Sequence, residues 1–237
     1  MTEIADVDRS TPAAAPKPAG RRSAVHGTQV IAGVSVPDTP LIAEVLGYAQ
    51  TLYPPYLFNH AMRSWLFAAR IGQSRGIDCD LEVVAVGTIL HDIGLSPAVA
   101  GPNRFEVNGA AAATKERAAR GLGRRRAQLL WDLVALNSTP SLALHKEAEV
   151  AVGTMGIGLD YGGFFVDLIP AADIAEIVRA FPRLAMKNRF AETCRHLVAA
   201  RPETTSDNFL RDFGERFVPG YTPVSTVDLL MNAPFDE

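Results

Sequence analysis

The sequence predicts an all-α fold, arranged as one helical domain. From residue 38 onward, apolar residues recur at spacings of three and four between turn signals, and no convincing run of alternating β-branched residues occurs. At 237 residues, the chain can bury a core without disulfide bonds. We expect a single domain over residues 26–237, preceded by a disordered Pro/Ala-rich tail over residues 1–25.

The first two helices should follow proline-containing turns. Thr39 is a typical N-cap, with proline at the next position and apolar residues at helical spacing as far as Leu52. The stretch between Pro55 and Gly76 has the same periodicity, and glycine commonly ends a helix. An amphipathic first helix is therefore expected, followed by a second helix that carries His60.

The third helix should be buried. Asp80 can cap it, and its residues from Val83 to Leu90 are apolar nearly all round. His91 and Asp92 follow at its C-terminal end. An ionisable pair at the end of a core helix costs free energy unless a partner compensates it, and a bound cation would do so.

Six further helices are expected, over residues 106–121, 124–136, 146–155, 172–181, 184–200 and 208–217. The glycine-rich stretch GIGLDYGG, residues 156–163, is expected to separate two of them. The last residues should form a loose tail.

Composition excludes several classes of function. The net charge of −3 and pI near 6 provide no field that would attract nucleic acid. No apolar run reaches the roughly 18 residues of a membrane helix. Cys79 and Cys194 lie far apart in the sequence and outside any C-x-x-C motif. We expect a soluble cytoplasmic protein with a small-molecule substrate, possible homodimerisation, and neither a nucleic-acid nor a membrane partner.

His91, Asp92 and the earlier His60 are candidate ligands of a divalent metal ion. His60 precedes His91 by 31 positions on the preceding helix, so antiparallel packing of the two helices would bring them face to face. Imidazole and carboxylate suit zinc, iron and manganese alike. Asp160 is the expected fourth ligand, with Asp167 and Asp173 as alternatives; Asp160 could instead cap a helix that begins at residue 161.

A histidine, a His-Asp doublet and a later aspartate resemble the H…HD…D signature of the HD superfamily of metal-dependent phosphohydrolases and related enzymes. The segments FNHAMRSWLFA, LHDIGL, RFEVNGA and GIGLDYGG resemble the cyanamide hydratase-like HD proteins over roughly residues 40–200. The resemblance implies an HD-domain helical bundle, with zinc as the first choice of metal and iron or manganese as alternatives. It also implies metal ligation by His60, His91, Asp92 and Asp160, and a metal-activated water that adds to a small nitrile carbon.

The same resemblance implies three further site residues. Asn137 stands where these relatives usually carry histidine, and asparagine can form hydrogen bonds but cannot transfer a proton. Arg63 or Asn137 would orient the substrate, and Glu106 would support the site or simply begin a helix. His145 is an alternative to the missing histidine.

We therefore expect an enzyme, a metal-dependent hydro-lyase or hydrolase of small nitrile- or amide-like substrates. One alternative is a nucleotide or phosphomonoester phosphohydrolase, in which Arg63 or Lys115 binds phosphate. The others are an iron-dependent oxygenase and a non-catalytic ligand-binding module.

Overall fold

The computed structural model describes residues 27–119 and 122–235. The predicted N-terminal tail lies outside these residues. In chain order, the elements are β1 (Gly27–Ile31), β2 (Val34–Asp38), α1 (Pro40–Leu52), α2 (Pro55–Arg75), α3 (Leu81–Leu90), α4 (Phe105–Ala119), α5 (Arg124–Ala135), α6 (Pro140–Ala143), α7 (Ala148–Gly162), α8 (Ala171–Ala180), α9 (Met186–Ala200), α10 (Leu210–Phe217) and α11 (Thr226–Met231), with short 3-10 turns at Ile93–Leu95, Pro97–Val99, Val166–Leu168 and Pro202–Thr204.

The predicted all-α class is confirmed, and the first three helices begin and end where their sequence signals place them. The Thr39 hydroxyl accepts a hydrogen bond from the amide of Ile42 at the start of α1. Gly76 ends α2 in the left-handed conformation, with φ of 61°. The Asp80 carboxylate accepts hydrogen bonds from the amides of Glu82 and Val83 at the start of α3.

The hairpin β1–β2 was not predicted from the sequence. The strands pair antiparallel, with Gly27 opposite Asp38, and residues 32 and 33 form the turn between them. Both turn residues have positive φ, which suits a tight hairpin. Val34 and Val36 are buried while Ser35 between them is exposed, so β2 adds an alternating edge to the helical core.

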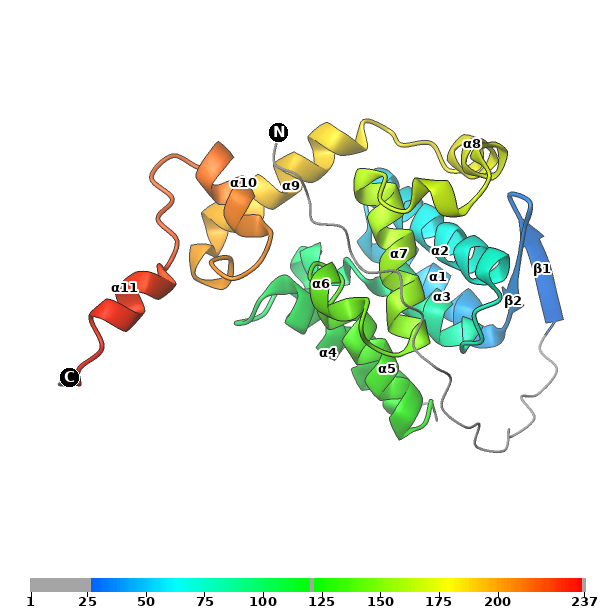
Figure 1. Cartoon of the computed structure of the whole chain (residues 1–237), viewed down its shortest axis with the longest axis horizontal. Helices are drawn as coiled ribbons and strands as arrows, with labels where there is room; N and C mark the ends of the chain where they lie inside the picture. Colours follow the sequence, from blue (N-terminus) through cyan, green and yellow to red (C-terminus); the bar gives the residue numbers. More distant parts are fainter. Residues whose placement is uncertain (1–26, 120–121, 236–237) are drawn as a thin grey trace.

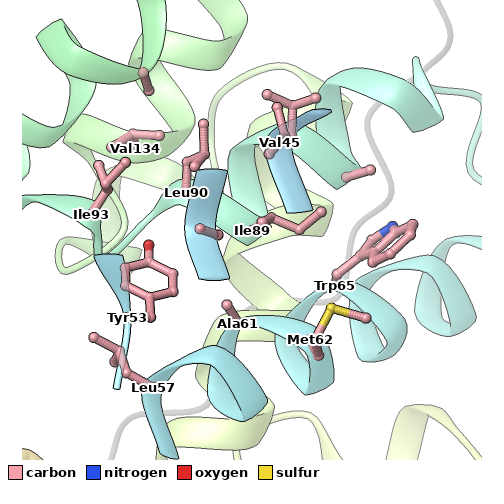
Figure 2. Close-up of a cluster of buried hydrophobic side chains, with 14 of the residues drawn as sticks. Val45, Tyr53, Leu57, Ala61, Met62, Trp65, Ile89, Leu90, Ile93 and Val134 are labelled. Carbon is pink, nitrogen blue, oxygen red and sulfur yellow. The ribbon is translucent and has the colours of Figure 1, made fainter. Parts of the chain in front are cut away.

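Helix α3 lies at the centre of the bundle. Every residue from Val83 to Leu90 is buried, as its apolar sequence predicts. Figure 2 shows Ile89 and Leu90 among side chains from α1, α2 and α5, which include Val45, Trp65 and Val134. Because the core immobilises α3 on all sides, the residues that follow it are held in a fixed position.

Helix α7 is longer than predicted. The glycine-rich stretch does not separate two helices; α7 continues through it to Gly162, which also rules out the alternative that Asp160 caps a helix starting at Tyr161. Figure 1 shows α7 crossing beside α2. A Cβ atom on Gly156 would lie 2.3 Å from the Ser64 carbonyl oxygen and 2.5 Å from the Ala68 amide nitrogen of α2. The glycine therefore serves close helix packing rather than a turn.

The remaining helices differ from prediction mainly at their ends. Leu184 and Ala185 have positive φ, so α9 begins at Met186 rather than at residue 184. The end of the helix expected over residues 106–121 lies partly outside the described residues. Helices α6 and α11 were not predicted. Figure 1 shows α10 and α11 at the end of the molecule opposite the hairpin.

We predict that Gly156→Ala destabilises the fold by about 1–3 kcal/mol, because the added methyl group overlaps the backbone of α2. Gly72→Ala is the matched control in α2, since its Cβ would meet Val152 of α7 at an ordinary 3.6 Å. The control should be neutral or stabilising by about 0.5–1 kcal/mol, as expected for glycine to alanine within a helix. Urea unfolding followed by circular dichroism measures both, and equal stabilities for the two variants would contradict this packing argument.

Candidate metal centre

Three buried side chains from two packed helices meet at one point. His60 lies within α2, and His91 and Asp92 directly follow α3. The Nε2 atoms of the two imidazoles are 3.1 Å apart. Oδ2 of Asp92 lies 3.2 Å from Nε2 of His91 and 3.6 Å from Nε2 of His60. These residues are placed to hold a metal ion together, as the sequence predicts for this part of the ligand set.

The other nitrogen of each imidazole has an acceptor as its partner. Nδ1 of His91 lies 2.8 Å from the Thr88 carbonyl oxygen, and Nδ1 of His60 lies 2.6 Å from the Asp160 carboxylate. Because neither oxygen can donate, both Nδ1 atoms carry the hydrogen, and in a neutral ring Nε2 then presents a lone pair. Two lone pairs and the Oδ2 of Asp92, which has no hydrogen-bond partner, thus face one another in a buried space.

Such an arrangement needs a positive charge at its centre. A divalent cation fits the donor set, because it would accept both imidazole lone pairs and neutralise the unpaired carboxylate oxygen. Without a metal ion, a proton bound to one of the imidazoles would have to supply the positive charge. The Asp92 carboxylate outweighs the effect of burial and raises the pKa of His91, whereas burial lowers the pKa of His60.

Asp160 contacts His60 at Nδ1, the ring nitrogen that does not face His91 and Asp92. Its carboxylate accepts a hydrogen bond from Nδ1 of His60, two from the guanidinium of Arg63 at 2.6 and 2.8 Å, and one from Arg183 at 3.0 Å. Burial disfavours the charged carboxylate, but the hydrogen bonds from His60 and Arg63 outweigh it and hold the pKa of Asp160 well below its usual range. The structure thus brings Asp160 to the site, on the Nδ1 side of His60 rather than among the three facing ligand atoms.

The alternative carboxylates do not join the group. Asp173 forms an ion pair with Arg70, and Asp167 is exposed on the turn after α7. His145, the alternative to the missing histidine, is exposed as well. Asp160 therefore remains the candidate of the three that touches the site.

A cavity of about 280 Å³ opens beside His60, His91 and Asp92. Its wall consists mainly of apolar and aromatic side chains. Besides the ligands, the lining residues are Asn137, Ser138, Pro140, Thr154, Ile157, Gly158, Tyr161, Phe164, Phe165, Phe190 and Phe209. No lysine or arginine is among the described residues that line it.

Asn137 is one of the two residues expected to orient a substrate. It lines the cavity, but its amide group donates hydrogen bonds to the carbonyl oxygens of His91, at 3.1 Å, and Val134, at 2.7 Å. The Asn137 side chain thus links the end of α5 to the backbone of His91, a candidate metal ligand.

Arg63 and Glu106, the other expected catalytic residues, do not line the cavity. Arg63 is completely buried behind His60 and donates to Asp160 and to the carbonyl oxygen of Phe181. Glu106 is also completely buried, and it accepts hydrogen bonds from Arg104 and from the hydroxyl of Ser138, which does line the cavity. Glu106 is therefore linked to the cavity through Ser138, whereas Arg63 is linked to it through Asp160 and His60.

Comparison with known families agrees with this geometry. Residues 57–151 match the family model of the HD domain. The matched segment includes His60, His91 and Asp92, whereas Asp160 lies beyond its end. HD domains are helical and commonly belong to metal-dependent hydrolases.

A search of curated proteins found no match to the chain. Within the described parts of the chain, no helix is both long enough and apolar enough to cross a membrane.

Sequence reasoning missed most of the cavity wall. Thr154 and Tyr161 come from α7, Phe190 from α9, and Phe209 from the residue before α10. The continuation of α7 through its glycines sets the placement of Tyr161, and no short motif connects the two phenylalanines to His60, His91 and Asp92. A signal was present only for Thr154, which lies among apolar residues of a predicted helix.

We predict that His91→Ala removes bound metal, because it deletes one of the two facing imidazoles. Purified protein should contain about one divalent ion per chain, and the variant should contain close to none. His145→Ala is the matched control, since His145 is exposed and should leave the metal content unchanged. Elemental analysis by mass spectrometry measures both. Full metal content in folded His91→Ala would contradict the assignment.

Asp160→Asn should weaken metal binding about 10–100-fold without abolishing it, as expected when a carboxylate that orients a ligating imidazole is neutralised. A competition titration with a zinc chelator gives the affinity, and circular dichroism of the metal-free variant controls for folding. If the folded variant binds no metal even at saturating concentration, Asp160 is itself a ligand.

Proposed function

We propose that the chain is a metal-dependent hydratase or hydrolase that adds water to a small nitrile- or amide-like substrate. The observation that carries this proposal is the position of the ligand group, which borders a mainly apolar cavity with no lysine or arginine in its described lining. A neutral substrate suits such a cavity, whereas a phosphate ester would require cationic partners.

A divalent cation bound at His60, His91 and Asp92 would polarise a substrate and lower the pKa of a water molecule. The chain's own residues prepare that site. Asp160 holds the hydrogen on Nδ1 of His60, so that Nε2 stays available as a ligand. The Thr88 carbonyl does the same for His91.

The surrounding residues would position these groups and limit access of water. Asn137 fixes the backbone of His91, and Arg63 neutralises the buried charge of Asp160. Glu106 orients the Ser138 hydroxyl at the cavity wall. We assign Arg63 and Glu106 positioning roles, because neither borders the space in which a substrate would lie.

The balanced reaction converts a nitrile and one water molecule into an amide, or an amide and one water molecule into a carboxylate and an ammonium ion. The phosphohydrolase alternative draws on Arg63 or Lys115 for phosphate binding. Arg63 is fully engaged with Asp160 and backbone oxygens, and Lys115 is exposed and does not line the cavity. The cavity therefore favours a neutral substrate.

We predict that metal-loaded protein converts nitriles or amides, and that His91→Ala lowers the rate at least about 100-fold, since one ligand of the activating metal is lost. Product formation can be followed by chromatography, with nucleoside monophosphates and p-nitrophenyl phosphate tested in parallel and His145→Ala as control. Turnover of a phosphate ester alone would replace the hydratase proposal by the phosphohydrolase. Metal retention without any turnover would favour a ligand-binding module.

A further inference from the structure

The cavity has a continuous aromatic wall that begins at the metal ligands. The ring of Phe190 packs edge-on against the imidazole of His60, with ring centroids 6.2 Å apart. The ring centroids of Tyr161 and Phe209 lie 5.8 and 6.3 Å from that of Phe190. Tyr161 is 46% exposed, and Phe164 is 58% exposed, so the lining extends from the buried ligands to solvent.

Four polar side chains besides His60, His91 and Asp92 line this cavity. Tyr161 is 46% exposed, and Asn137 and Ser138 already have partners. The Asn137 amide donates to two backbone oxygens, and the Ser138 hydroxyl donates to Glu106. Thr154 is only 2% exposed, and its hydroxyl has no hydrogen-bond partner. A buried hydroxyl without a partner is costly, so this group is available to a ligand that enters the cavity.

The volume and charge of the cavity restrict that ligand further. About 280 Å³ is just below the usual range for ligand pockets, roughly 300–1,000 Å³, which suits a single ring rather than a nucleotide. Aromatic walls favour a flat apolar body through offset or edge-to-face packing. The lack of lysine and arginine among the described lining residues disfavours an anion.

The geometry points to an uncharged substrate with an aromatic or comparably flat apolar body, whose polar head hydrogen-bonds to Thr154 beside the metal ligands. Thr154 is then the specificity-determining residue, and the aromatic wall selects against very small polar substrates. This inference deepens the proposed function and rests on it for the identity of the head group, a nitrile or an amide.

Binding of benzamide and of acetamide to the metal-loaded full chain, measured by isothermal titration calorimetry, tests the inference without relying on turnover. Benzamide should bind at least about tenfold more tightly than acetamide, because only its ring contacts the aromatic wall. Thr154→Val, which keeps the shape but removes the hydroxyl, should weaken benzamide binding about tenfold. Thr154→Ser should restore it.

Two phenylalanine variants test the wall itself. Phe164→Ala should weaken the binding of benzamide but not of acetamide. Phe217→Ala, a partly exposed residue outside the cavity lining, should change neither. Thermal melts of each variant verify that it is folded.

Equal affinity for the two amides, or unchanged benzamide binding by folded Thr154→Val, would overturn the inference. If the protein shows either of these binding results and also hydrates small aliphatic nitriles, the proposed function is supported and only the aromatic substrate class is overturned. The predicted binding pattern without turnover of benzonitrile or benzamide would support the ligand class and contradict the proposed catalytic function.

Discussion

The structure depends on one electrostatic constraint, the convergence of two imidazole nitrogens and a carboxylate oxygen in a buried space. His60 and His91 each use Nδ1 as a donor to a fixed oxygen, so their Nε2 atoms face each other and Asp92 as acceptors. Such a group is unfavourable without a positive charge at its centre. The fit of this group to a cation therefore follows from hydrogen bonding within the protein, independently of the match to the HD domain model.

The scaffold maintains this convergence through close packing. Helix α3 is buried on all sides and fixes the doublet at its end. The contact of Gly156 with the backbone of α2 brings α7 close to the helix that carries His60. Asp160, four residues further along α7, can then reach His60 and Arg63. Replacing one partner of this buried network would leave a charge uncompensated, which is strongly destabilising.

Local signals made the helices and the ligand group predictable. Caps and apolar periodicity define α1 to α3, and the doublet at the end of a buried helix indicates a metal. The orientation of Asp160 was not predictable, because spacing in sequence does not fix which nitrogen of His60 a carboxylate meets. The glycines of α7 were read as a loop, since a short-range pattern cannot distinguish a turn from close helix packing.

The anomalous scattering of a zinc-loaded crystal tests the central claim most directly. The account predicts a single strong peak within bonding distance, about 2.0–2.2 Å, of Nε2 of His60, Nε2 of His91 and Oδ2 of Asp92. A peak elsewhere in the chain with this space unoccupied, or a water molecule in place of zinc at saturating metal concentration, would contradict it.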